Sequence, residues 1–204
     1  MATSSMKKTV AFTAVITLIS FLYKLGLGIY TMSIILMIAS VSTLLVFIAK
    51  ITFVRNATSN RQSKKKAYLI IAGITLLYSL IFILFGVLKI FGIDTSNQKT
   101  YEGIYGAIFI AFILVMFILS FARLRGALAK NNLIVIGLKE IIFVSALTDL
   151  VIIEEFVSRI VLRYVDVPSL PKINSYFVLA ISAIMLIIPI VMIIRGIRYK
   201  ADKE

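Results

Sequence analysis

The sequence predicts an all-α membrane protein: a bundle of six transmembrane helices with both termini in the cytoplasm. Its hydrophobic fraction is 61% and its charged fraction only 15%, whereas soluble domains carry roughly 25% charged residues. So little charge cannot cover a water-facing surface, but it suits lipid. Its basic residues also gather at alternate ends of the apolar runs. The 204 residues are expected to form a single transmembrane domain, 1–204.

The first two expected helices are 9–27 and 30–50. The first apolar run is short, but Lys24 can keep its ammonium at the membrane surface while its stem lies along the helix. Lys7 and Lys8 before an apolar run are also typical of a signal peptide. No small-residue cleavage site precedes Lys24, so we expect this helix to be retained. The second run exceeds the about 20 residues that span a bilayer.

Four more helices are expected, at 67–90, 103–122, 133–156 and 173–195. Three of them follow from runs that are long enough and free of charge. The range 133–156 is interrupted by three ionisable residues, so we expect it to face protein rather than lipid. Pro189 lies inside the last helix and should bend it, because proline lacks a backbone donor.

The distribution of basic residues predicts the orientation. With the N-terminus inside, 15 of the 22 lysines and arginines fall at inside ends and 6 at outside ends, as the positive-inside rule requires. We therefore expect a multi-pass protein of the cytoplasmic membrane. The basic loop with Arg61, Lys64, Lys65 and Lys66 would contact anionic lipids, so the net charge of +13 needs no nucleic-acid partner. High lysine and isoleucine usage suggests a bacterial source.

The helix 133–156 holds the main functional candidates, because ionisable residues within spans are costly and often functional. Asp149 lies one turn after Ser145, so the two share a face. Hydroxyls on the helix 30–50 form a second polar stripe. The candidate intramembrane polar site comprises Asp149, Ser145, Thr43, Ser40, Lys139 and Glu140. Alternatively, Asp149 is a buried carboxylate paired with Lys139 or with a basic residue of another helix, and the hydroxyls serve helix packing.

Histidine and cysteine are both absent, which removes the usual general base and the thiolate nucleophile. We therefore expect no enzyme, no catalytic residue, no cofactor and no metal centre of ordinary type. The segment from Glu154 to Arg159 resembles the EExxxR pattern of CAAX-type intramembrane proteases, which also need histidines. We interpret Glu155 and Arg159 as an ion pair one helical turn apart.

The stretch KLGLGIYTMS, from Lys24 to Ser33, resembles the signature of cation diffusion facilitator transporters. In that family a lysine, a glycine and a serine join helix one to helix two. The resemblance implies six helices with cytoplasmic ends and metal ligands in pairs on helices two and five. Their counterparts here are Ala39, Thr43, Ser145 and Asp149. Only one of these four positions, Asp149, therefore carries an acid or histidine. The family's cytoplasmic C-terminal domain also has no counterpart, which argues against a zinc or manganese exporter.

Three functions follow as hypotheses. The first is a transporter-like bundle for a small solute or a cation other than zinc. The second is a non-transporting partner, immunity or regulatory subunit of a membrane complex, with a homodimer or another membrane protein as its partner. The third is the substrate-capture subunit of a vitamin transporter, which can have six helices in this length.

Overall fold

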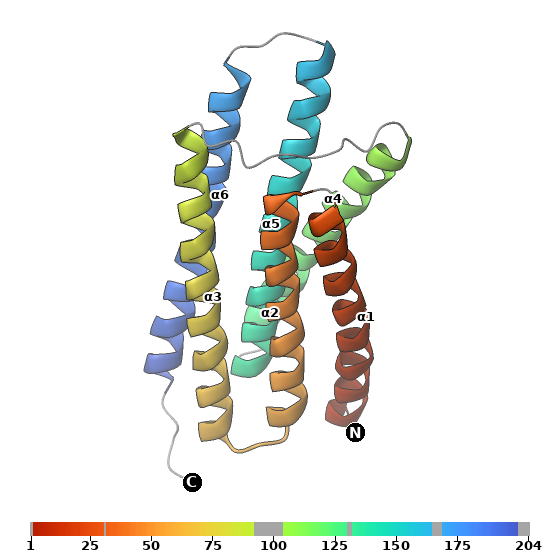
Figure 1. The fold of residues 1–204 in the computed structure, drawn as a ribbon. Coiled ribbons are helices and arrows are strands. Elements are labelled where there is room, and N and C mark those ends of the chain that lie inside the picture. Colours follow the sequence, from red (N-terminus) through yellow and green to blue (C-terminus); the bar gives the residue numbers. More distant parts are fainter. Residues whose placement is uncertain (1, 31, 92–103, 130–131, 165–168, 200–204) are drawn as a thin grey trace.

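The computed structural model describes residues 2–30, 32–91, 104–129, 132–164 and 169–199. Within these ranges the chain forms six α-helices that assemble into a bundle (Figure 1). They are α1 (Ala2–Tyr30), α2 (Ile34–Asn56), α3 (Arg61–Ile90), α4 (Ile104–Leu128), α5 (Leu133–Tyr164) and α6 (Leu170–Arg198). The prediction of an all-α fold with six helices is therefore confirmed.

The turn between α1 and α2 lies later in the chain than expected, because Ser33 caps α2. The Ser33 hydroxyl accepts a hydrogen bond from the Leu36 N–H at 3.3 Å, and Met32 adopts a left-handed φ of 51°. A serine here satisfies one of the N–H groups that a helix start leaves unpaired. As a result α1 ends at Tyr30 instead of at residue 27, and α2 begins at Ile34 instead of at residue 30.

The helices also extend beyond the apolar runs. α3 begins at Arg61 instead of 67, after Asn60, whose side chain accepts a hydrogen bond from the Ser63 N–H at 2.9 Å. α5 continues to Tyr164 instead of 156, and α2, α4 and α6 are longer than expected in the same way. Hydropathy marks only the part of a helix that suits lipid. Polar capping residues and charged side chains let the helices continue past that part.

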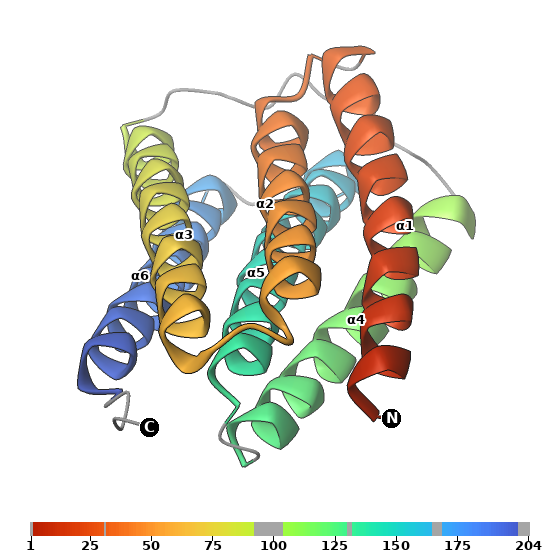
Figure 2. The ribbon, with the colours of Figure 1, turned by 90° about the horizontal axis from the view of Figure 1, so that it is seen from below.

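α5 is the central helix of the bundle. It packs against α2, α3, α4 and α6, whereas in the described part of the chain α1 packs on α2 alone and α4 on α5 alone. Figure 2 shows α5 between α6 and α4, with α1 on the side of α2 away from α3. Val144 and Val151 of α5 are almost completely buried. Residues on α5 are therefore placed to contact the four helices that pack around it.

Pro189 is buried within α6. Because proline has no N–H, the carbonyl of Met185 one turn earlier has no partner inside the helix. Ser79 of α3 supplies a partner, since its hydroxyl lies 2.8 Å from the Met185 oxygen and 2.9 Å from the oxygen of Thr75 in its own helix. The interruption of α6 is thus matched by a donor from the helix beside it, and α6 continues to Arg198.

Among the described residues, four helices are long and apolar enough to cross a membrane: α1 from Lys7 onward, α2, α3 and α6. Large apolar side chains on their outer faces are exposed, including Leu77 at 64% and Ile187 at 58%. Such a surface suits lipid better than water. The first turn of α1 and the last turn of α6 lie at the same end of the bundle (Figure 1).

Candidate functional site

The acidic residues of the described ranges all lie on α5: Glu140, Asp149, Glu154 and Glu155. Three of them form ion pairs with a cation from another helix. Removing one partner of a buried ion pair costs about 3–5 kcal/mol, because the other charge is left without compensation. These pairs therefore fix α5 against the helices around it.

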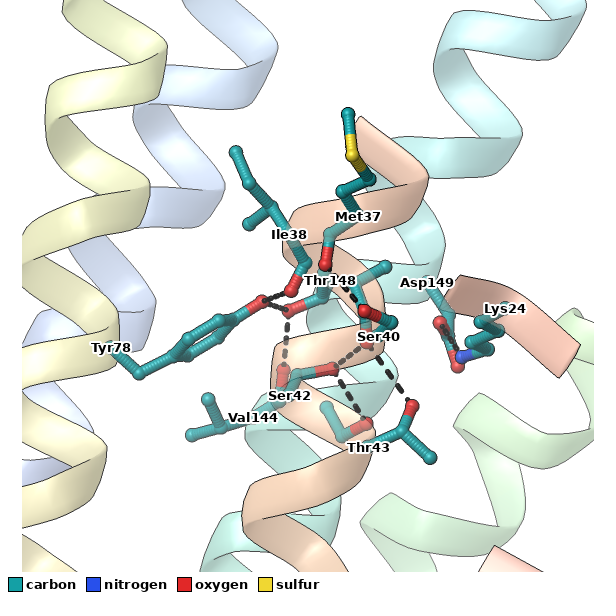
Figure 3. Close-up of polar contacts among 12 residues, drawn as sticks. Lys24, Met37, Ile38, Ser40, Ser42, Thr43, Tyr78, Val144, Thr148 and Asp149 are labelled. Carbon is teal, nitrogen blue, oxygen red and sulfur yellow. Dashed lines mark hydrogen bonds and ion pairs between the residues drawn. The ribbon is translucent and has the colours of Figure 1, made fainter. Parts of the chain in front are cut away.

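Asp149 forms an ion pair with Lys24 of α1, with 2.6 Å between Nζ and Oδ1. Figure 3 shows the lysine reaching across from α1 to the face of α5 that carries Asp149. The two side chains keep 19% and 22% of their surface exposed, respectively. Because the described parts of α1 and α5 do not pack directly, this pair is a side-chain bridge between two helices that are otherwise apart. The Lys24 ammonium is thus directed at the α5 carboxylate, a partner that was not expected from the sequence.

Hydroxyl groups join α2, α3 and α5 beside this pair. The Oγ atoms of Ser42 and Ser145 lie 3.2 Å apart, and Tyr78 Oη lies 3.0 Å from Thr148 Oγ1. Tyr78 also points at the carbonyl of Ile38 (Figure 3). In apolar surroundings such hydrogen bonds between helices contribute modestly to packing. They also place several polar atoms within a few residues of Asp149 along α5.

The predicted α2 residues are placed differently. Thr43 Oγ1 donates to the Ala39 carbonyl at 3.1 Å and Ser40 Oγ to the Met37 carbonyl at 2.7 Å, both within α2. The hydroxyl opposite Ser145 is that of Ser42, which is not among the predicted site residues. The structure therefore unites Asp149 and Ser145 on one face, while Ser40 and Thr43 are bonded to their own backbone.

Glu140 belongs to a separate cluster near the other end of α5. It forms an ion pair with Arg195 of α6 and accepts a hydrogen bond from Tyr68 of α3 at 3.0 Å. Arg195 also donates to the Tyr68 hydroxyl at 3.2 Å. Gly137 makes room for this arrangement, because a Cβ there would lie 2.6 Å from the Tyr68 ring. The structure thus separates Glu140 from Asp149, which the sequence had grouped together.

Lys139 does not neutralise either carboxylate. Asp149 takes Lys24 and Glu140 takes Arg195, so the pairing of Asp149 with Lys139 was wrong and the pairing with a basic residue of another helix is correct. Adjacent residues point about 100° apart around a helix, which explains why Lys139 lies on a different face from Glu140. Lys139 remains half-buried.

A third ion pair joins Glu155 to Lys89 of α3. Glu154 accepts a hydrogen bond from Ser158 at 2.9 Å, and its other oxygen is buried with no hydrogen-bond partner in the described part of the chain. The expected pair of Glu155 with Arg159 cannot be compared, because the Arg159 side chain lies outside the described residues. The structure adds Lys89 as a partner of Glu155.

Sequence reasoning missed Lys24, Lys89, Arg195 and Tyr68 as partners of the α5 carboxylates. A signal was present, because the four acids of α5 outnumber its own three basic residues, so at least one acid needs a cation from another helix. In an antiparallel bundle, Arg195 and Glu140 also fall at the same expected level, as do Lys89 and Glu155.

Besides the Lys24 ammonium, the polar side-chain atoms in this part of the bundle are the Asp149 carboxylate and hydroxyl oxygens. Such hard donors suit alkali ions, protons or magnesium-like ions better than zinc. In the described ranges no three histidine, cysteine, aspartate or glutamate side chains gather into a possible metal site. Of the four positions that correspond to metal ligands in the cation diffusion facilitator pattern, only Asp149 carries a charge.

A comparison with protein-family models, with curated proteins and with solved structures found no match to this chain.

Proposed function

We propose that the chain is a multi-pass protein of the bacterial cytoplasmic membrane that carries a small cation, or a solute coupled to one, by way of Asp149. The observation that carries this proposal is the Lys24–Asp149 ion pair between α1 and α5. A bare carboxylate within a span attracts a cation or a proton. Here an internal lysine already occupies it, so an incoming cation must compete with Lys24.

Competition of this kind couples the binding of a cation at Asp149 to the position of α1 against α5. When a cation or proton neutralises Asp149, Lys24 loses its partner, and the bridge between α1 and α5 opens. In the described part of the chain α1 packs only on α2, so this bridge is the direct link between α1 and α5. A ligand that binds one of two arrangements better shifts the population toward that arrangement. The ion pair and the bound cation would then mark two states of one carrier.

Three further features support this assignment. Hydroxyls of Ser42 and Ser145 lie close together on the same side of α5 as Asp149. The donor set is free of sulfur and imidazole, which agrees with a cation other than zinc. The basic residues Lys7, Lys8, Arg55 and Arg61 lie at the end where α1 begins and α2 meets α3, which the positive-inside rule assigns to the cytoplasm.

The test is ion flux in proteoliposomes, with Na⁺, K⁺ and H⁺ gradients applied in turn. The decisive variant is Lys24→Met/Asp149→Leu, which removes both charges and so leaves neither one uncompensated. Its matched control is Lys89→Met/Glu155→Leu, which removes a similar pair between α3 and α5. Since α3 and α5 also pack directly, the control should leave flux close to that of the wild type.

We expect flux of at least one cation in the wild type and in the control, and loss of that flux in the Lys24/Asp149 variant. Circular dichroism and size-exclusion chromatography must show all three proteins folded. Absence of flux for every ion in the wild type, or equal flux in both variants, would remove the transport proposal. The chain would then be better explained as a subunit of a larger membrane complex.

A further inference from the structure

Glu154 lies on a deeply buried stripe of α5. Successive residues of a helix point about 100° apart, so one helical face carries Leu147, Val151, Glu154 and Ser158. The other three side chains of this face are almost entirely buried, at 3%, 0% and 7% exposure in chain order. An acidic side chain therefore continues a face that otherwise packs inside the bundle.

The two oxygens of the Glu154 carboxyl group have different surroundings. Oε1 accepts a hydrogen bond from the Ser158 hydroxyl at 2.9 Å. Oε2 is buried and has no hydrogen-bond partner, and it is the one buried side-chain oxygen or nitrogen of the described chain in that position. An ionised carboxylate accepts hydrogen bonds at both oxygens, and burial of a charge without partners is costly. These surroundings therefore disfavour the ionised form of Glu154.

The polar groups that α3 and α6 bring to this end of α5 are engaged elsewhere. Lys89 of α3 forms an ion pair with Glu155. Its charge also reaches Glu154, so one described cation serves two adjacent carboxyl groups. The Ser175 hydroxyl of α6 lies 3.3 Å from the carbonyl oxygen of Lys89 and 2.9 Å from that of Pro171. Neither helix offers Glu154 a donor of its own.

The other charged groups at this end of the bundle leave the same balance. Lys24 of α1 is paired with Asp149, and Lys172 is exposed in the first turn of α6. The described parts of α2 and α4 bring no acidic or basic residue to this level. The Arg159 side chain lies outside the described residues. Within the described chain, the carboxyl groups at this end therefore outnumber the cations buried with them.

We propose that Glu154 is a proton-binding site, and that it is a neutral carboxylic acid in the folded protein at neutral pH. The proton is held on Oε2, while Oε1 keeps the hydrogen bond from Ser158. A metal ion would need more oxygen ligands than this position offers, and among the described residues no three acidic side chains gather. The inference does not depend on transport through Asp149.

Loss of this proton should weaken the packing of α5. It would place an uncompensated charge beside Glu155, in surroundings of low dielectric where like charges repel strongly. The folded chain holds a proton that the unfolded chain releases in mildly acidic solution. Relative to Glu154→Gln, the ratio of folded to unfolded wild-type chains should therefore fall about tenfold for each pH unit, until the folded chain releases the proton as well.

The experiment is infrared spectroscopy of the full chain in lipid bilayers at neutral pH. It measures the carbonyl band of protonated carboxyl groups, which ionised carboxylates lack. Glu154→Gln is the decisive variant, because the amide has the size of the neutral acid. Asp149→Asn is the matched control, since the Asp149 carboxylate is paired with Lys24 and is expected to be ionised.

We expect the band in the wild type and in Asp149→Asn, and its loss in Glu154→Gln. Ser158→Ala keeps the carboxyl group but removes the hydrogen bond to Oε1, so the band should persist at a higher frequency. This second variant tests the site even where Glu154→Gln fails to fold. An unchanged band in both Glu154→Gln and Ser158→Ala would overturn the proposal.

Two further outcomes would also count against a proton at Glu154. Absence of the band from the wild type would show that Glu154 is ionised and held by a cation such as Arg159. Loss of the wild-type band on addition of Na⁺ at constant pH would assign the site to a metal ion instead. Equal stability of the wild type and Glu154→Gln at every pH would contradict the expected linkage between proton binding and folding.

Discussion

Ser79 shows how one residue can stabilise a helix to which it does not belong. Its hydroxyl reaches the Met185 carbonyl, which Pro189 leaves without an N–H donor. An unsatisfied carbonyl buried in apolar surroundings costs about 1–3 kcal/mol. Proline inside α6 is therefore tolerated because α3 carries a donor at the right level.

Replacing Ser79 by alanine should lower the free energy of unfolding by about 1–3 kcal/mol. Pro189→Ala restores an N–H donor for Met185, so the cost of Ser79→Ala should be much smaller in that background. Equilibrium unfolding in mixed detergent micelles measures both. Ser40→Ala is the control, because Ser40 bonds only within its own helix. A cost for Ser79→Ala that is the same with and without Pro189 would contradict this account.

The close contact between α3 and α5 depends on a single glycine. Gly137 of α5 lies against the Tyr68 ring of α3, and an added Cβ would come within 2.6 Å of it. Tyr68 in turn positions its hydroxyl between Glu140 and Arg195. The close approach of α3 and α5 is therefore required for the charged cluster at this end of α5.

Gly137→Ala should destabilise the protein by about 1–3 kcal/mol, the usual cost of overpacking. Gly73→Ala is the matched control, since a Cβ there meets nothing within 4 Å and alanine favours the helix by about 1 kcal/mol. The two variants should shift thermal unfolding in detergent in opposite directions. Equal shifts for both would show that the Tyr68 contact does not matter.

Much of the element-level structure could be predicted from the sequence. Apolar runs gave the number and order of helices, because their length is set by lipid. The ends were predicted less well, since caps such as Ser33 and Asn60 depend on local hydrogen bonds rather than on hydropathy. The face shared by Asp149 and Ser145 follows from helical periodicity. Their partners Lys24 and Ser42 could not be predicted, because the pairing depends on which helices become neighbours.

At the scale of the whole molecule, the other helices supply the basic side chains that pair with the acidic residues of α5. Lys24, Lys89 and Arg195 come from three different helices and meet three carboxylates of α5. The two pairs at its ends join helices that also pack together, while the middle pair joins α1, which does not pack on α5. The bundle thus has one firmly packed part and one helix attached mainly through α2.

The orientation can be tested directly because the chain has no cysteine. Thr58→Cys places a thiol in the exposed turn between α2 and α3, and Ser169→Cys places one in the segment before α6. A membrane-impermeant maleimide applied to intact cells should label the second and spare the first. Permeabilised cells, in which both should react, are the control. Labelling of Thr58→Cys from outside would reverse the proposed topology.

The most direct test of the central claim is the distance between α1 and α5 in lipid. Spin labels at the exposed positions Leu22 and Val161 report it by pulsed electron resonance. We predict one main distance in the wild type, and a second population when the cation that the proposal requires (Na⁺, K⁺ or H⁺) is added. Asp149→Asn should show the second population without any cation, because Lys24 has lost its partner. One unchanged distance in the wild type, Asp149→Asn and Lys24→Met would contradict the claim that this ion pair holds α1 against α5.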